Sequence, residues 1–542
     1  MKTRLAFGLV MALSGACSII GGPARAADLS AGAAAVQPES PAGLMQLPAV
    51  IERVRKQFQV PGLAVAIVKD GKLVLARGYG VRRLGQPATV DGQTLFAIAS
   101  NTKAFTATAL QMLAEQGKLD MDGRVTDYLP GFQMSDPYVT HEMRIRDLLA
   151  HRSGLSLGAG DLLYWPPTRY SAQEVVEHLR DVPLTSGFRS HYAYDNILFD
   201  VATLVIEKVS GMSYADFVRQ KILLPAGMNQ TLVHDHTLPA GLDVATGHAL
   251  ANFSQLQTVP EMTWANNLGA GSLYSNADDM ARWMNILLAG GALPSGRHLF
   301  STASRDQMWT MLTPIPVPPA SVSQLEAARP NYLGYGEGFF LSDYQGQRLV
   351  WHTGGWPGMV SRITLVPGLD LGVAVLTNQE SGAAFNAVTM TILDAYMGRS
   401  GIDWTAAYAA AADKAAGTAD SEVARHQAAR SRQAPPSLPL EGYVGTYHDR
   451  WYGDVVIRRI KGQLRLSFSK TPLLVGTLEP WQHDSFVVHW DDRSLNADAF
   501  VDFSLDEDGK VISARMHPVS ARTDFSFDFQ DLRLQRQPAV AH

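Results

Sequence analysis

Apolar residues near the N-terminal end alternate in two short runs and then change to helical spacing. Residues 63–69 and 72–79 are rich in apolar and β-branched side chains, and Asp70-Gly71 joins them. An Asp-Gly pair between two such runs is typical of a β-hairpin. Residues 103–116 instead repeat apolar side chains every three to four positions. The pattern therefore predicts a hairpin followed by a helix.

The later part of the chain returns to strand-like patterns after a long helical stretch. Residues 120–330 alternate helical patterns with polar loops, and three apolar runs follow at 348–353, 361–366 and 371–377. A helical pattern over 383–397 comes next. We therefore expect one α/β mixed domain, in which the early hairpin and the late strands share a sheet with the helical insert beside it.

Residues beyond 400 predict a linker and a separate β domain. An Ala-rich, helix-favouring stretch covers 401–438 and ends at a cluster of prolines. Period-two alternation then predicts strands at 454–459, 463–468, 485–490, 499–505, 510–517 and 525–534. Such a series predicts an antiparallel β barrel or half-barrel over 439–537, after a catalytic domain over 42–400.

The N-terminus has the pattern of an export signal. Lys2 and Arg4 precede an apolar run over 5–20, and Ala24-Arg25-Ala26 is a small-x-small cleavage site. This predicts a signal peptide over 1–26, a flexible leader over 27–41, and a periplasmic or secreted protein. Lipoprotein processing at Cys17 is less favoured, because Ser14 stands where an aliphatic residue is expected.

Composition and charge narrow the class of protein further. The 542 residues are enough for two or three domains, and the formal net charge of −5 does not suggest nucleic acid as a partner. The one cysteine lies in the predicted leader, so no disulfide is expected in the mature chain. The apolar run is short for a spanning helix, so stable membrane insertion is not expected either.

Ser100 and Lys103 are the first candidates for chemistry. Three residues apart at the start of a helix, their side chains would lie on one face, with Cβ atoms about 5–6 Å apart. A serine hydroxyl needs a neighbour to take its proton, and a lysine with a lowered pKa can do so. Ser100 could instead be an N-cap, but a cation in the first turn opposes the helix dipole. Residues 467–470 repeat the pattern in a predicted strand.

Two later motifs complete the candidate site, Tyr194-Asp195-Asn196 and His352-Thr353-Gly354-Gly355. In this order and spacing the chain resembles the serine β-lactamase / D-alanyl-D-alanine peptidase superfamily, and in particular the class C β-lactamase-like serine hydrolases. The resemblance covers roughly residues 45–400 and includes supporting stretches at 148–155, 225–228 and 270–275. It implies the β-lactamase/transpeptidase-like sheet with a helical insert.

The resemblance also implies catalytic roles. Ser100 would attack a carbonyl and form an acyl-enzyme, and Lys103 would help to remove its proton. Tyr194 would be a phenolate-like base and later an acid, which requires a lowered Tyr194 pKa. The backbone N–H groups of Ser100 and Gly355 would form an oxyanion hole, and Gly354 would let the strand approach the substrate.

The remaining implied roles concern binding. Asn196, His352 and Thr353 would hold the substrate, and no metal or other cofactor is implied. β-Lactamases of this superfamily usually have Lys where His352 stands, and a histidine is only partly cationic near neutral pH. The clamp for a substrate carboxylate is therefore weaker, and β-lactamase activity is the less favoured reaction.

Several residues offer competing interpretations. Tyr274-Ser275-Asn276 repeats the Tyr-x-Asn pattern but fits a helix-capping segment better. His234-Asp235-His236 could indicate a metal site, although a solvated loop is the simpler interpretation. Trp351 and Trp356 flank the third motif and could line the acyl pocket or pack in the core. In the β domain the same choice between core and ligand is open for four aromatic residues: Trp451, Tyr452, Trp481 and Trp490.

These observations predict an exported serine hydrolase that cleaves amide bonds of short peptides with D- or unusual residues through an acyl-serine. Peptidoglycan stem peptides are one candidate substrate. The layout also resembles that of enzymes that cut linearised microcystin. Esterase activity on small acyl esters, and a penicillin-binding receptor with slow turnover, are the alternatives. A small peptide is the expected partner, and a homo-oligomer is the expected form of any assembly.

Overall fold

The computed structural model describes residues 41–431 and 433–538. The predicted signal peptide and all of the predicted leader except residue 41 lie outside the described residues. Within the described ranges, no helix combines the length and the apolar character needed to cross a bilayer.

An antiparallel sheet of eight strands organises the part of the chain before residue 400. Its order is β2-β1-β13-β12-β11-β10-β9-β8, so the early hairpin and the late strands share one sheet, as predicted. Leu63 in β1 lies opposite Thr377 in β13. The short edge strands β8, β9 and β10 were not predicted. The strand bounds are β1 Gly62–Lys69, β2 Lys72–Gly80, β8 Thr313–Pro314, β9 Leu333–Tyr335, β10 Phe340–Tyr344, β11 Gln347–Trp356, β12 Met359–Val366 and β13 Leu371–Thr377.

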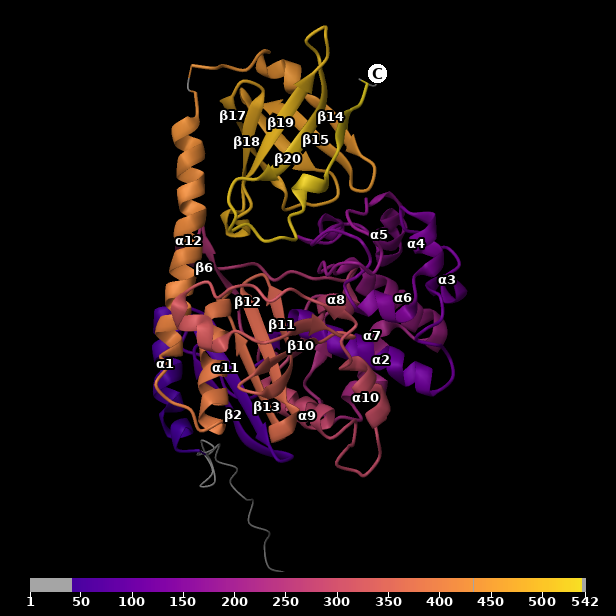
Figure 1. Ribbon diagram of the computed structural model, residues 1–542. Coiled ribbons are helices and arrows are strands. Elements are labelled where there is room, and N and C mark those ends of the chain that lie inside the picture. The colour runs from indigo at the N-terminus through magenta and orange to yellow at the C-terminus, as the bar shows by residue number, and fades with distance from the viewer. Residues whose placement is uncertain (1–40, 432, 539–542) are drawn as a thin grey trace, which may run out of the picture. The chain divides into compact units, whose positions relative to one another are not determined.

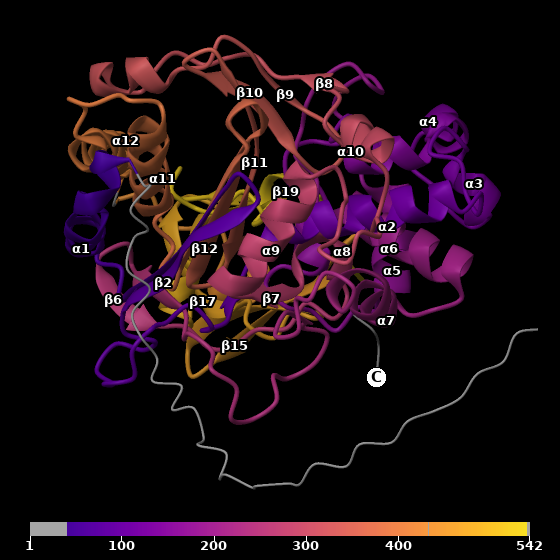
Figure 2. The ribbon, with the colours of Figure 1, turned by 90° about the horizontal axis from the view of Figure 1, so that it is seen from below.

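Helices cover both faces of this sheet. Along β1, Leu63, Val65 and Ile67 pack toward α1 and α11, while Ala64 and Ala66 pack toward the opposite face. Figure 2 shows α1, α11 and α12 on one side of the sheet and α9 on the other, next to the helical insert. Both faces of β1 are therefore buried, which explains its continuous apolar run. The helix bounds are α1 Leu47–Gln57, α2 Lys103–Glu115, α3 Val125–Tyr128, α4 Pro137–Glu142, α5 Ala172–His178, α6 Ile197–Ser210, α7 Tyr214–Phe217, α8 Leu268–Gly271, α9 Ala277–Leu288, α10 Thr302–Met308, α11 Gly382–Tyr396 and α12 Trp404–Ala429.

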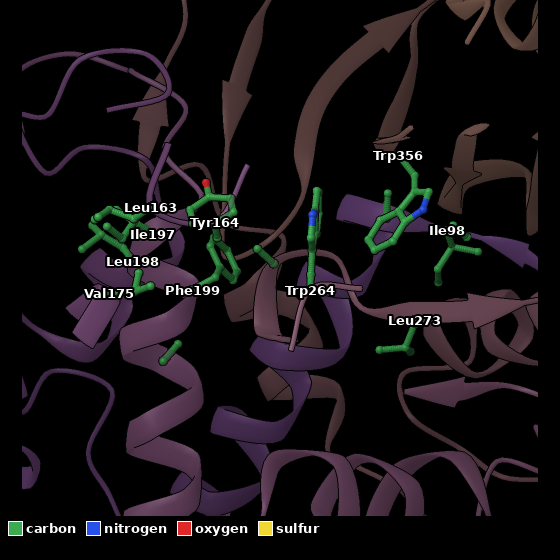
Figure 3. Close-up of a cluster of buried hydrophobic side chains, with 14 of the residues drawn as sticks. Ile98, Leu163, Tyr164, Val175, Ile197, Leu198, Phe199, Trp264, Leu273 and Trp356 are labelled. Atoms are coloured by element: carbon green, nitrogen blue, oxygen red, sulfur yellow. The ribbon is translucent and has the colours of Figure 1, made fainter. Parts of the chain in front are cut away.

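A buried apolar cluster holds the first turns of α2 and α6 in place. Figure 3 shows it extending from Ile197 and Phe199, at the start of α6, across Trp264 and Trp356 to Ile98, just before α2. The Trp264 and Trp356 rings are 4.3 Å apart between centroids. Small strands complete this region, with bounds β3 Phe96–Ala97, β4 Leu232–Val233, β5 His248–Ala251, β6 Gln255–Thr258 and β7 Leu273–Ser275.

The C-terminal strands form a closed antiparallel barrel of eight strands, which follows α12 in the chain (Figure 1). Trp451, Tyr452 and Trp490 are buried in its core, and Trp481 is half-buried against the Phe500 ring. The strand bounds are β14 Gly445–Asp449, β15 Gly453–Ile460, β16 Gln463–Phe468, β17 Val475–Gln482, β18 Ser485–Trp490, β19 Ala499–Leu505, β20 Val511–Pro518 and β21 Leu534–Arg536.

The strand predicted over 525–534 is wrong. The alternation of Phe525, Phe527 and Phe529 imitates a strand, but only β21, which begins at Leu534, pairs there. Asp524 accepts a hydrogen bond from the Ser526 backbone N–H at 2.9 Å, which turns the chain locally instead of leaving it extended. Strands β14 and β17 were missed, and β17 contains Pro480, which lies at a register shift.

Candidate active site

Ser100 and Lys103 lie together at the start of α2, as their spacing predicted. Ser100 belongs to a 3-10 turn over Ala99–Thr102, and Lys103 begins the α-helix. Lys103 Nζ lies 3.0 Å from Ser100 Oγ. Ser100 remains partly exposed to a cavity, whereas the Lys103 side chain is fully buried. The hydroxyl is thus accessible while the amine beside it is shielded from water.

Burial changes the acid–base behaviour of Lys103. Loss of hydration lowers its pKa to about 7, although the nearby carboxylates of Asp161, Asp195 and Asp200 oppose the change. Besides Ser100, Nζ contacts Asn196 Oδ1 at 2.7 Å and the Ala270 carbonyl at 3.1 Å. Because both of these atoms are acceptors, a neutral amine would donate to them and keep its lone pair for the Ser100 hydroxyl.

The Tyr194 hydroxyl does not have the lowered pKa that was predicted. Burial raises the pKa of Tyr194, and its hydrogen bond with Ser100 only partly opposes the rise. Lys103 Nζ lies 4.8 Å from the centre of the Tyr194 ring. Lys103 is not a fixed cation that could lower the Tyr194 pKa, because burial lowers its own pKa to about 7 and the amine is largely neutral above that pH. Tyr194 is therefore a protonated donor toward Ser100.

Asn196 is the last residue of the Tyr194-Asp195-Asn196 motif and lies directly before α6. Its amide connects Lys103 with Asp161. Its Oδ1 accepts from Lys103, and its Nδ2 donates to Asp161 Oδ2 at 3.0 Å. An amide nitrogen has two N–H groups, so one of them is left for a substrate. Asp195, between Tyr194 and Asn196, accepts from Ser153 Oγ at 3.1 Å and is buried away from the nucleophile. Ser153 is thus a structural residue.

His352 is a neutral side chain in this structure. Its Nδ1 lies 2.6 Å from the Thr353 carbonyl and must donate to it, so Nε2 accepts from the Tyr335 hydroxyl at 2.8 Å. Burial and the neighbouring Lys103 hold the pKa of His352 well below its usual range. The sequence indicated a partly cationic group, and the structure gives an uncharged wall of the cavity.

Gly354 and Gly355 have different surroundings on β11. A Cβ atom at Gly354 would lie 2.1 Å from the Ile98 carbonyl oxygen, so this glycine lets β11 approach the segment before Ser100, and not the substrate as predicted. A Cβ at Gly355 would meet nothing within 4 Å. Strand β10 pairs with β11 only as far as Trp351, which leaves this end of β11 to face the 3-10 turn of Ser100.

A cavity of about 320 Å³ opens in front of Ser100. Six aromatic side chains contribute to its wall, together with Leu157, and its lining includes four of the other predicted residues. The aromatic residues are Trp165, Tyr192, Tyr194, Trp264, Phe340 and Phe525, and the other predicted residues are Asn196, His352, Thr353 and Gly355. Among the described lining residues there is no Lys or Arg, and Asp524 is the one carboxylate.

Part of this lining comes from the barrel. The segment 524–526, between β20 and β21, contributes Asp524, Phe525 and Ser526 to the cavity. Sequence reasoning missed these residues because the Phe alternation was interpreted as a strand. It also missed Trp165 and Trp264, and it left open whether Trp351 and Trp356 line the acyl pocket; neither of these two lines the cavity. A tryptophan beside two prolines, in the loop that contains Trp165, was the available signal.

The competing motifs have structural roles. Tyr274 is buried in β7, and Asn276 caps α9 by accepting from the Asp279 N–H. His234 is buried and its Nε2 contacts Glu261 Oε1 at 3.1 Å, whereas His236 is exposed, so the two histidines do not converge. Residues 467–470, which repeat the Ser-x-x-Lys spacing, lie at the end of β16, where Ser467 Oγ donates to the Val456 carbonyl.

Residues 47–397 match the family model described as Beta-lactamase. The match covers well over half of the chain, so the chain belongs to the beta-lactamase family of serine hydrolases. Residues 429–536, which include the barrel strands, match a domain of unknown function, DUF3471.

Individual relatives agree with this assignment. Unguisins hydrolase ungD' of Aspergillus campestris is 27% identical over 425 residues, which is 75% of this chain and 76% of the relative. The octameric penicillin-binding protein homologue from Pyrococcus abyssi superposes with a TM-score of 0.57 at 21% identity, over 91% of this chain and 99% of that one. D-amino acid amidase from Ochrobactrum anthropi SV3 gives 0.54 at 23% identity, over 65% and 99%. The two structures show a shared fold.

Proposed function

We propose that this hydrolase cleaves amide bonds of short peptides, including peptides with D- or other unusual residues, through an acyl-enzyme on Ser100. The observation that carries the proposal is the contact of 3.0 Å between Ser100 Oγ and a buried Lys103 whose pKa is about 7. A neutral amine at this distance is a general base for the hydroxyl near physiological pH.

In the acylation step, Lys103 Nζ accepts the Ser100 proton while Oγ forms a bond with the substrate carbonyl carbon. Asn196 Oδ1 and the Ala270 carbonyl stabilise the resulting ammonium, since both already accept from Nζ. Tyr194 donates its hydroxyl proton to the leaving nitrogen as the C–N bond breaks, and Lys103 returns a proton to Tyr194. Water then attacks the acyl carbon while Lys103 takes its proton, the bond between this carbon and Ser100 Oγ breaks, and Lys103 returns the proton to Oγ.

The oxyanion that develops in both steps would be held by the backbone N–H groups of Ser100 and Gly355. Both residues line the cavity, and Gly354 brings β11 against the carbonyl of Ile98, two residues before Ser100. Two such donors typically contribute several kcal/mol to the transition state. The free N–H of Asn196 and the backbone at Thr353 would orient the peptide.

The lining of the cavity supports apolar or aromatic peptide side chains and argues against a carboxylate clamp. His352 is neutral, and no Lys or Arg stands among the described lining residues. A penicillin or a terminal peptide carboxylate would meet no fixed cation there. This charge pattern favours hydrolysis of neutral peptide bonds over a penicillin-binding receptor or a β-lactamase.

The names of similar proteins support the substrate class. One relative is named as an unguisins hydrolase, and one structure is that of a D-amino acid amidase complexed with L-phenylalanine amide. We extend the proposal to linearised microcystin-type and peptidoglycan-type peptides as substrates, and to export through the N-terminal signal. A homo-oligomer remains a prediction, which light scattering of the purified protein would check.

The test is mass spectrometry of purified protein incubated with linear peptides that contain D-alanine, with Ser100→Ala as the control. Cleavage by the wild type and not by the variant is the expected result. Hydrolysis of p-nitrophenyl esters without peptide cleavage would move the assignment to an esterase. A stable penicillin adduct without turnover would indicate a receptor.

A further inference from the structure

Asp161 is a fully buried carboxylate that stands behind Asn196, on the side away from Ser100. Its Oδ2 accepts from Asn196 Nδ2 at 3.0 Å and from Ser526 Oγ at 2.7 Å, and its Oδ1 accepts from the Tyr164 hydroxyl. Asn196 in turn contacts Lys103, and Lys103 contacts Ser100. A continuous hydrogen-bonded chain thus leads from the barrel to the nucleophile.

The barrel also holds the backbone on both sides of Asp161. The Asp528 carboxylate accepts from the Gly160 N–H at 2.8 Å and from the Leu162 N–H at 3.2 Å. Both groups belong to the catalytic domain, whereas Asp528 and Ser526 follow β20 in the barrel. The barrel therefore fixes where Asp161 lies as well as what it contacts.

The orientation of the Asn196 amide depends on such an acceptor. A primary amide can turn by half a rotation and exchange its oxygen for its nitrogen. Burial raises the pKa of Asp161 well above its usual range, and a proton on its Oδ1 can point to the Tyr164 hydroxyl. Its Oδ2, which faces Ser526 and Asn196, then accepts in either protonation state, so Asp161 requires Nδ2 on its own side and leaves the Asn196 Oδ1 for Lys103. In the reversed amide, Nδ2 would face Lys103 Nζ and compete for the lone pair that Ser100 needs.

We propose that Asp161 is a positioning residue that fixes the Asn196 amide for Lys103, and that the barrel completes the active site by holding Asp161 through Ser526 and Asp528. This inference rests on the proposed function in one respect, namely that Ser100 is the nucleophile. It assigns the barrel a part in catalysis that does not require a ligand inside it.

The charges around Lys103 give the proposal a second readout. Asp161, Asp195 and Asp200 each raise the pKa of Lys103 against the effect of burial, and Tyr194 and His352 are the other titratable groups close to it. Burial also raises the pKa of Asp161 well above its usual range, so its replacement by Asn should lower the pH midpoint for Ser100 reactivity as far as the carboxyl is ionised at that midpoint. Asp200 is the matched control, since burial raises its pKa well above the usual range as it does for Asp161, while its carboxyl has no hydrogen-bond partner among the described residues.

The experiment measures the rate at which a fluorophosphonate probe labels Ser100 in the full-length protein, as a function of pH. We expect Asp161→Asn to slow labelling by about 10- to 100-fold above the midpoint and to lower the midpoint. Asp200→Asn should lower the midpoint while the plateau rate stays within about threefold. Ser526→Ala, which leaves Asp161 in place, should slow labelling by about three- to tenfold.

Ser156→Ala is the matched interface control. Ser156 Oγ donates to Asp531 Oδ2 at 2.8 Å, so this variant removes a hydrogen bond between the same two domains without touching Asp161. Its labelling should equal that of the wild type. A loss equal to that of Ser526→Ala, or an unchanged plateau in Asp161→Asn, would overturn the inference. Labelling that persists in Ser100→Ala would instead remove the proposed function on which it rests.

Discussion

The two walls of the cavity in front of Ser100 differ in what they are made of. One wall, here called the motif wall, consists of short motifs in the catalytic domain at 100–103, 194–196 and 352–355, and the polar groups of the first two motifs are hydrogen-bonded to each other. The other part of the lining, here called the recognition wall, includes aromatic side chains from the loop that carries Trp165 and from the barrel segment 524–526. The first wall holds the groups that can move protons, and the second mainly offers apolar surface. Chemistry and recognition are thus carried by different parts of the chain.

Replacement of Lys103 should cause the largest loss of activity, because the motif wall would lose its general base. Lys103→Met should reduce kcat by about 10³-fold or more on a peptide substrate. Lys103→Arg should be equally impaired, since a guanidinium keeps its charge and cannot accept a proton from Ser100. Steady-state kinetics with the folded variants checks this. An arginine variant with more than a tenth of wild-type activity would show that Lys103 serves only as a cation.

Tyr194→Phe should give the next largest effect, and the effect should depend on the leaving group. A protonated hydroxyl is needed where a poor leaving nitrogen must be protonated, so we expect about a 10²-fold loss on peptide amides. A p-nitrophenyl ester leaves without protonation, so its loss should stay below about tenfold. Comparison of the two substrates with one variant separates an acid role from a packing role. Equal losses would contradict the assignment.

Activity should also follow the ionisation of Lys103. Because burial lowers its pKa to about 7, the amine is protonated below that pH and unable to accept the Ser100 proton. Thus kcat/KM should fall by about tenfold for each pH unit below the midpoint and level off above it. A pH profile measured with an uncharged peptide tests this. A rate that stays constant from pH 5 to pH 8 would exclude Lys103 as the base.

Within the motif wall, the contact between Ser100 and Lys103 could be predicted because it is local, whereas Tyr194, Asn196 and His352 were assigned to the site through the family resemblance. The three-residue spacing at the start of a helix places Ser100 next to Lys103. The Tyr-x-Asn motif directly precedes α6, and the His-Thr-Gly motif lies near the end of β11. The sheet was predicted for a similar reason, since β1, β12 and β13 are long apolar runs. The direction of the Tyr194 pKa, the partial charge of His352 and the role of Gly354 were wrong, because burial and the packing of β11 against Ile98 are tertiary properties that no spacing reveals.

The recognition wall could not be predicted because its residues meet only through tertiary structure. Phe525 and Trp165 are far apart in sequence and belong to different domains, yet both line one cavity. The segment around Phe525 has strand-like alternation, but Asp524 and Asp528 bind backbone N–H groups and keep it out of the barrel's ladder. Asp161 likewise begins a short 3-10 turn, Asp161–Leu163, that carries no motif, and only its partners reveal its position.

Phe525→Ala should give the smallest effect and would test whether the barrel wall recognises substrate. The Phe525 ring lies edge-on to Tyr194 with 5.9 Å between centroids, and its side chain is exposed toward the cavity. Loss of one aromatic contact should raise KM about fivefold for a peptide with an aromatic residue beside the scissile bond, with kcat nearly unchanged. Ile512→Ala, which removes an exposed apolar side chain of β20, is the control.

If both variants leave KM unchanged, the barrel contributes positioning through Asp161 but no substrate contact through Phe525. A fall in kcat with Phe525→Ala would instead mean that the two walls are mechanically coupled at Tyr194.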